Sequence, residues 1–289
     1  MFKRAEKHIS DSEAKRALPH DRKEVFFDLL SHRKMTLFAL SCFAFMFFIP
    51  LAVDLLYFNY WESVALSSDV PNKVAHLFSL IFYSMVIMIP CVVIGFIGLA
   101  GAFYAAKKLV WQEDTTLAVD FFQGIKENWK HALLNGLFFA IFLFGLVVGG
   151  VYLFLYSRVS PIWCGVGIGG LILIFITFGI VISLNFTQDV YYVNGFLTTV
   201  KNSFCFLGLL NWKVLILFVF TTGVVIALGF INMITLAVGL FLFAILNSVV
   251  IVIYTLLSHS AFDKYINKEH YPDMVGKGLY KLVKEDKEA

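Results

Sequence analysis

Few polar side chains interrupt the long apolar stretches of this sequence, and those few are the candidates for chemistry. Asp54 is the only carboxylate within such a stretch. A charged side chain at the centre of a bilayer costs about 2.5–3.5 kcal/mol on insertion scales, so a membrane protein keeps one mainly where it pairs, binds or conducts something. The other polar candidates lie within or just beyond apolar stretches, at Asn135, Asn185, Asp189 and Asn247.

Each candidate has a structural interpretation beside a functional one. Asn247 lies near the middle of the last apolar stretch. A hydrogen bond to a neighbouring helix is the common use of such a residue, and a solute path past Asn185 and Asn247 is the alternative. Asp189 follows an apolar stretch, where a solvated residue at a helix end is equally expected. Asp54 lies about one turn from the end of its stretch, within reach of interfacial water.

No pattern typical of catalysis or metal binding accompanies these residues. The seven histidines avoid the middle of the apolar stretches and form no HExxH motif, and the four cysteines have no CxxC spacing. GxSxG, P-loop and dinucleotide-binding glycine motifs are also absent. We therefore expect a non-enzyme without metal or cofactor. With a net charge of +3 and no basic cluster among aromatics, we expect no nucleic-acid partner.

The elements that must position these residues follow from composition. Of 289 residues, 60% are hydrophobic and 15% charged, and the mean hydropathy of +0.81 exceeds the soluble range. A window of about 19 residues predicts an all-α, polytopic membrane helix bundle. Its six transmembrane helices are expected at residues 35–57, 75–106, 132–156, 164–187, 213–231 and 234–257. This membrane domain, 35–257, lies between a basic cytoplasmic segment, 1–34, and a cytoplasmic tail, 258–289.

The distribution of basic residues predicts the orientation. If the amino terminus is cytoplasmic, only Lys73 and Arg158 of the 23 Lys and Arg residues fall on the outer side. Basic residues concentrate in cytoplasmic loops. We therefore expect a multi-pass protein of the plasma membrane, embedded in the lipid bilayer, with both termini in the cytoplasm.

Two segments between apolar stretches are amphipathic and resemble each other. They align at a constant offset of 75 residues, each before a membrane span. We expect two cytoplasmic interfacial helices, each part of a unit that is present twice in the same orientation. Such a parallel repeat predicts a pseudo-twofold axis along the membrane normal. The matched positions are Phe121, Phe122, Ile125, Lys126 and Trp129 in the first segment and Phe196, Leu197, Val200, Lys201 and Phe204 in the second.

These amphipathic helices admit two interpretations. In the first, each helix lies in the headgroup region and anchors the bundle through its aromatic face. In the second, the helices form a docking surface for a cytoplasmic partner, as the coupling helices of ATP-driven importers do. The sequence leaves both interpretations open.

Four stretches of the chain resemble the YesL-like family of bacterial membrane proteins, a domain family of unknown function. They are residues 21–51, 98–137, 186–212 and 262–279. The last is similar to the tail of clostridial members, with Asn267, Tyr271, Pro272 and Gly278 in the expected order. Members often occur beside genes for carbohydrate uptake, so the resemblance implies a part in sugar transport. We also expect the bacterium to be Gram-positive. The resemblance assigns no residue a role.

The predicted function is therefore accessory. We expect a non-catalytic membrane component that associates with a carbohydrate transport system through its cytoplasmic helices and tails. Its partner would be a transport permease or ATPase, or a second copy of the chain. The alternatives are a self-contained transporter or channel for a small solute, with its path between the repeats, and a lipid-binding membrane scaffold that retains anionic lipid.

Overall fold

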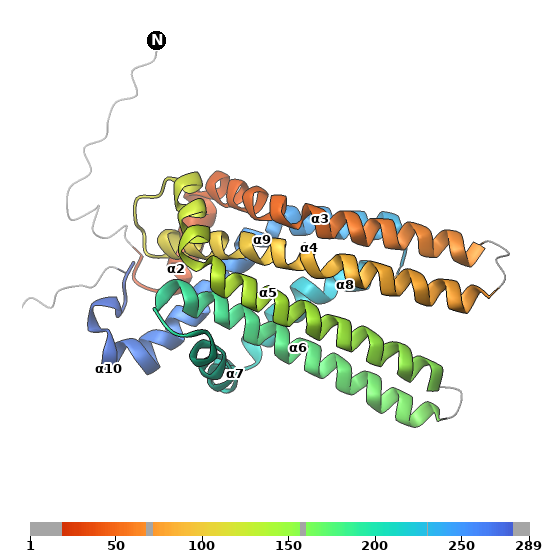
Figure 1. Cartoon of the computed structure of the whole chain (residues 1–289). Coiled ribbons are helices and arrows are strands. Elements are labelled where there is room, and N and C mark those ends of the chain that lie inside the picture. The colour runs from red at the N-terminus through yellow and green to blue at the C-terminus, as the bar shows by residue number, and fades with distance from the viewer. Residues whose placement is uncertain (1–18, 68–71, 157–159, 230, 280–289) are drawn as a thin grey trace, which may run out of the picture.

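The computed structural model describes residues 19–67, 72–156, 160–229 and 231–279, and every regular element in these ranges is a helix. Figure 1 shows long helices running side by side in a bundle. The main elements are α2 (Arg22–His32), α3 (Lys34–Ser67), α4 (Lys73–Val110), α5 (Leu117–Tyr156), α6 (Pro161–Tyr191), α7 (Phe196–Phe218), α8 (Val224–Gly229) and α9 (Met233–Phe262). The short elements are two π-helical turns, η1 (Val219–Gly223) and η2 (Asp263–Asn267), with α10 (Lys268–His270) and the 3₁₀ turn η3 (Pro272–Met274).

The structure confirms a helix bundle with several helices suited to crossing a membrane, as predicted. Five described helices, α3, α4, α5, α6 and α9, are long and apolar enough to cross a bilayer. The segments Phe196–Leu209 and Lys213–Gly229 together provide up to one more span, and they meet at an angle of 105°. The second segment corresponds to the predicted span at 213–231.

Several helices extend beyond the predicted apolar stretches, among them α3, which runs past residue 57 to Ser67. α5 joins the first amphipathic segment and the third predicted span in one helix from Leu117 to Tyr156. α9 continues past residue 257 to Phe262, and η2 prolongs it by a wider turn. Hydropathy indicates only the part of a helix that lipid can cover, whereas backbone hydrogen bonding continues into polar sequence.

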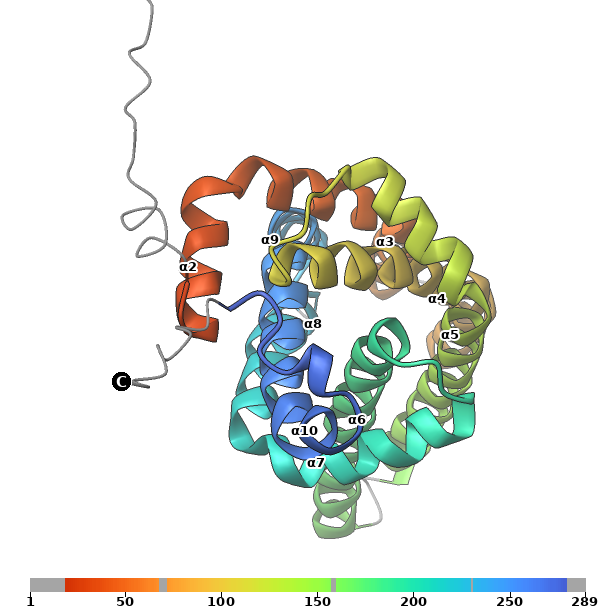
Figure 2. The same cartoon turned by 90° about the vertical axis from the view of Figure 1, so that its left-hand side faces the viewer.

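One end of the bundle carries most of the polar structure. Figure 2 views this end and shows α2, the first turns of α5, the first part of α7 and α10 together, with α7 lying across the bundle. We call it the capped end and define it by α2, the first turns of α5 and α7, and residues 263–279. Because α2 and α10 lie at the same end, the chain enters and leaves the bundle on one side.

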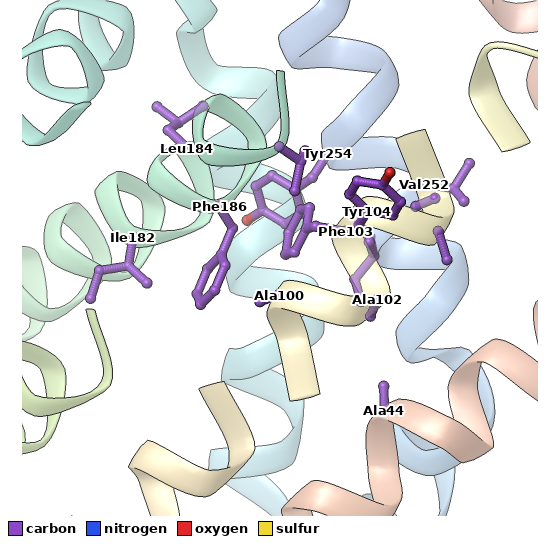
Figure 3. Close-up of a cluster of buried hydrophobic side chains, with 14 of the residues drawn as sticks. Ala44, Ala100, Ala102, Phe103, Tyr104, Ile182, Leu184, Phe186, Val252 and Tyr254 are labelled. Atoms are coloured by element: carbon purple, nitrogen blue, oxygen red, sulfur yellow. The ribbon is translucent and has the colours of Figure 1, made fainter. Parts of the chain in front are cut away.

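Small residues bring the helices of the bundle together. A Cβ at Gly98 of α4 would overlap the Phe47 ring of α3, and a Cβ at Gly124 of α5 would overlap the side chain of Tyr104. Such close approach is how glycine serves helix packing in membrane proteins. Farther into the bundle, Figure 3 shows Phe103, Phe186 and Tyr254 gathered between α4, α6 and α9. The rings of Phe103 and Phe186 stack with their centroids 5.5 Å apart.

Candidate functional site

Three of the five polar candidates form one hydrogen-bonded chain between α5 and α6. Asn185 Nδ2 donates to Asn135 Oδ1 at 2.9 Å, and Asn135 Nδ2 donates to Asp189 Oδ2 at 3.3 Å. His131 Nδ1 lies 2.7 Å from the other carboxylate oxygen of Asp189. Residues four apart share a helix face. His131 and Asn135, one turn apart on α5, therefore face Asp189 and Asn185, one turn apart on α6.

The hydrogen-bonded chain stabilises the buried carboxylate of Asp189. This side chain is 3% exposed, and a buried carboxylate without partners is strongly unfavourable. The imidazole of His131 and the amide of Asn135 supply partners for both oxygens. The prediction of a solvated helix-end residue is therefore wrong for Asp189. His131 was not among the predicted site residues, although its spacing of four from Asn135 was a usable signal.

A polar pocket of about 450 Å³ opens beside this chain at the capped end. Lys107, Glu127 and Asn194 line it together with His131 and Asp189. Lys107 Nζ donates to the carbonyl oxygen of Val190 at 2.5 Å and so joins the end of α4 to the end of α6. Basic and acidic side chains both line the pocket, which suits a polar solute better than a simple anion or cation.

Asp54 lies apart from this pocket, at an interface between helices. It is buried in α3, and the hydroxyl of Ser84 in α4 donates to its Oδ2 at 3.2 Å. The structure thus differs from the predicted contact with interfacial water. Asp54 holds two spans together through a polar contact, as polar side chains in membrane helices commonly do.

Asn247 also lies apart, and its predicted helix-to-helix hydrogen bond is made by its neighbour. The backbone N–H of Ser248 donates to Ser41 Oγ at 2.9 Å, and Ser248 Oγ donates to the carbonyl oxygen of Leu37 at 2.7 Å. These bonds join α9 to α3. Asn247 is only 5% exposed, yet its Nδ2 has no hydrogen-bond acceptor among the described residues.

The two amphipathic segments differ in what they bury. In α5, Phe121 is fully buried against Phe43 and Phe47, with ring centroids 5.5 and 5.8 Å apart. In α7, the fully buried positions are Thr199 and Ser203. The remaining candidates divide into the exposed side chains Phe122, Lys126, Trp129, Leu197, Lys201 and Phe204, and the partly buried side chains Ile125, Phe196 and Val200.

The first turns of α7 are attached to the bundle through buried polar groups and through Phe196, whose ring stacks on Phe138 of α5. Gln188 Nε2 in α6 donates to Ser203 Oγ at 2.6 Å, and both residues are fully buried. Leu197 is 77% exposed, and Val193, just before the helix, is completely exposed. The exposed side chains of Val193, Leu197 and Phe204 therefore form an apolar stripe along α7 that faces away from the bundle and can contact lipid or another protein.

The carboxy-terminal segment, residues 263–279, is folded onto α2 and the end of α4, which no local sequence pattern predicted. Arg22 in α2 pairs with Asp263 at 2.9 Å and donates to the carbonyl oxygen of Lys277 at 2.8 Å. Lys277 Nζ pairs with Glu113 at 2.8 Å and lies 3.7 Å from the centre of the Trp111 ring. These contacts join both ends of the described chain to the end of α4.

Two further features fix this segment. Burial raises the pKa of the Tyr192 phenol, with a smaller contribution from nearby Asp263, so the neutral hydroxyl donates to Asn267 Oδ1 at 2.6 Å. Gly278 has a φ of +81°, and a Cβ there would overlap the backbone of Val110 and Trp111. Glycine is required at this position for both reasons. We interpret residues 263–279 as a structural clasp.

No protein-family model, curated protein or solved structure matches this chain. Among the described residues, no three His, Cys, Asp or Glu side chains lie close enough together to hold a metal ion.

Proposed function

We propose that this chain is a non-catalytic accessory component of a transport system in a bacterial plasma membrane, and that it contacts a transport permease or ATPase through its capped end. The observation that supports this most is the exposed apolar stripe of α7, with Leu197 at its centre. The resemblance to the YesL-like family remains a prediction, and carbohydrate as the transported class follows from it alone.

The exposure pattern of the two amphipathic segments supports a repeated contact surface. At the offset of 75, Phe122 and Leu197 are both exposed, as are Trp129 and Phe204. Exposed lysines, Lys126 and Lys201, occupy a third matched pair, and Ile125 and Val200 are partly buried in both copies. We therefore propose a parallel repeat that offers two similar surfaces, each with large apolar side chains beside a lysine. Aromatic anchors with a polar rim are typical of protein interfaces.

The proposed orientation places the capped end in the cytoplasm. Both described ends of the chain lie there with the amphipathic segments (Figure 2), as do most of the basic residues that the positive-inside rule assigns to the cytoplasm. A cytoplasmic ATPase, or the cytoplasmic loops of a permease, would therefore reach the exposed stripe of α7.

Photocrosslinking in native membranes tests the contact. Photoreactive residues at positions 123 and 198 would replace Gln123 and Thr198, which are both exposed. We expect a crosslink to a permease or ATPase that mass spectrometry identifies. Crosslinks to lipid alone would favour the headgroup anchor, and crosslinks to the same chain would favour self-association. Either result would remove the support for an accessory role.

A charge substitution tests whether the stripe carries the contact. We expect Leu197→Glu to abolish the crosslink from position 123 and to lower sugar uptake, because a carboxylate replaces an exposed apolar anchor. The matched control is Thr198→Glu, which adds the same charge one residue farther along the exposed surface. Equal loss in both variants would indicate a general charge effect. Phe121 is unsuitable for this test because it is fully buried.

The polar pocket favours a second candidate, a self-contained transporter for a small polar solute. The chain from His131 through Asp189 and Asn135 to Asn185 leads from the pocket toward the interior of the bundle. Purified protein in liposomes would then pass solute without a partner, and Asn185→Leu would lower the flux. Flux that needs a second protein, or that Asn185→Leu leaves unchanged, would count against this candidate.

A further inference from the structure

An apolar cavity of about 260 Å³ lies within the membrane-spanning part of the bundle, away from the capped end surfaces described above. Side chains from α3, α4, α6, α7, η1, α8 and α9 line it, and aromatic rings form much of its wall. They include Phe48, Phe103, Phe218, Phe243 and Tyr254. Cavities of a few hundred Å³ lined by apolar and aromatic side chains are typical of small-molecule sites.

Two polar groups in this wall have no hydrogen-bond partner among the described residues, the side-chain amide nitrogen of Asn247 and the hydroxyl of Tyr254. Asn247 lines the cavity, is 5% exposed, and leaves Nδ2 unpaired among the described residues. A buried polar group without a partner costs about 1–3 kcal/mol. The interhelical role is already filled by Ser248, which bonds to α3. The amide of Asn247 is therefore available to a group inside the cavity.

The cavity opens sideways, onto the surface that faces lipid. Residues at its edge, Phe220 of η1 and Leu242 and Leu246 of α9, are exposed on the outside of the bundle. All three belong to predicted membrane spans, so a ligand would enter from the bilayer. η1 forms part of the edge, and single π-helical turns inside helices are frequent at functional sites.

The chemistry of the wall restricts the occupant. Among the described residues, no Lys, Arg, Asp, Glu or His lines the cavity, so a charged group would enter without a described counter-ion. An N–H donor needs an acceptor oxygen, and a carbonyl group supplies one. The aromatic wall packs well against a flat ring.

We propose that this cavity binds a neutral carbonyl-bearing lipid from the bilayer, with Asn247 Nδ2 donating to its carbonyl oxygen. The shared chemistry is a carbonyl acceptor oxygen on a neutral, largely apolar molecule. A ring carbonyl, as in a prenylated quinone, and an ester carbonyl, as in a diacylglycerol, are two sources of that chemistry. This site is independent of the proposed contact at the capped end.

Native mass spectrometry tests the proposal on the full chain in phosphatidylcholine nanodiscs, with menaquinone-4 as the ring probe and dioleoylglycerol as the ester probe. We expect saturable binding of one equivalent of one probe. Asn247→Leu keeps the approximate size of the side chain but removes the donor, so we expect about tenfold weaker binding, the value of one hydrogen bond. The probe that binds identifies the source of the carbonyl.

A second variant pair keeps the test valid if Asn247→Leu fails to fold. Leu246→Trp places a bulky ring at the mouth of the cavity, while Leu173→Trp makes the same change at an exposed site on α6 outside it. We expect Leu246→Trp to weaken binding and Leu173→Trp to leave it unchanged. The proposal is overturned if neither probe binds in a saturable way, or if binding survives both Asn247→Leu and Leu246→Trp.

Discussion

The first turns of α5 and of α7 share a sequence pattern but are held to the bundle in different ways. α5 inserts Phe121 among the rings of α3 and packs Gly124 against Tyr104. Its buried Asp120 also pairs with Lys108 at 2.6 Å. α7 instead buries Thr199 and Ser203 and exposes Leu197. An apolar residue at every fourth position predicts that a helix has one apolar face. The neighbouring helices determine whether that face is buried. The start of α5 is part of the core, whereas the start of α7 presents a surface.

The largest expected difference between the two segments is at the first matched pair. Phe121→Ala should lower the free energy of unfolding by about 3–5 kcal/mol, because it removes a fully buried ring and leaves a cavity. Phe196 is only partly buried, against Phe138 with centroids 5.6 Å apart, so Phe196→Ala should cost about 1 kcal/mol. Unfolding in mixed detergent micelles, with circular dichroism as the signal, would measure both. Equal losses would contradict the assignment of α5 to the core.

Two glycines provide a second contrast between the packing of α5 and that of α7. A Cβ at Gly124 would overlap the side chain of Tyr104, whereas a Cβ at Gly208 of α7 would meet nothing within 4 Å among the described residues. Gly124→Ala should therefore destabilise the protein by about 1–3 kcal/mol through overpacking. Gly208→Ala should stabilise it by about 0.5–1 kcal/mol, because alanine restricts the unfolded chain and favours helix. Thermal unfolding in detergent would show opposite shifts, and shifts of the same sign would refute the difference in packing.

Hydropathy and periodicity predicted the parts of this fold that depend on local sequence. The apolar stretches, the two amphipathic segments and the candidates Asn135, Asn185 and Asp189 could all be found this way. Contacts between distant residues could not, because no local pattern encodes them. Arg22 pairs with Asp263, which lies 241 residues away, and His131 meets Asp189 only once α5 packs on α6.

The sequence also could not show which of two adjacent polar residues forms the hydrogen bond between helices. Asn247 and Ser248 are adjacent in α9, and either was a candidate for a bond between helices. A step of one residue turns a side chain by about 100° around the helix. Ser248 therefore faces α3, whereas Asn247 faces the cavity. Only the packing of α3 beside α9 separates their roles.

The polar attachment of α7 gives a smaller expected effect. Ser203 accepts the only hydrogen bond described for the Gln188 amide nitrogen, so Ser203→Ala should cost about 1–2 kcal/mol by leaving a buried donor unpaired. Asn128 occupies the matched position in α5 and donates within its own helix, to the carbonyl oxygen of Gly124 at 3.1 Å. Asn128→Ala should therefore change stability by less than about 0.5 kcal/mol. Hydrogen exchange at residues 196–209 would show faster opening in Ser203→Ala alone, and similar exchange in both variants would argue against a polar attachment.

The smallest expected change in stability lies on the exposed stripe. Leu197→Ser removes apolar surface that the bundle does not cover, so the free energy of unfolding should stay within about 0.5 kcal/mol of the original. Phe206 is the contrasting apolar residue of the same helix, because it is buried with its ring centroid 5.2 Å from that of Phe262. Phe206→Ser should cost several times more, through the cavity and the unpaired hydroxyl. If Leu197→Ser destabilised the detergent-solubilised protein as much as Phe206→Ser, the stripe would be part of the core, and the difference between α5 and α7 would be lost.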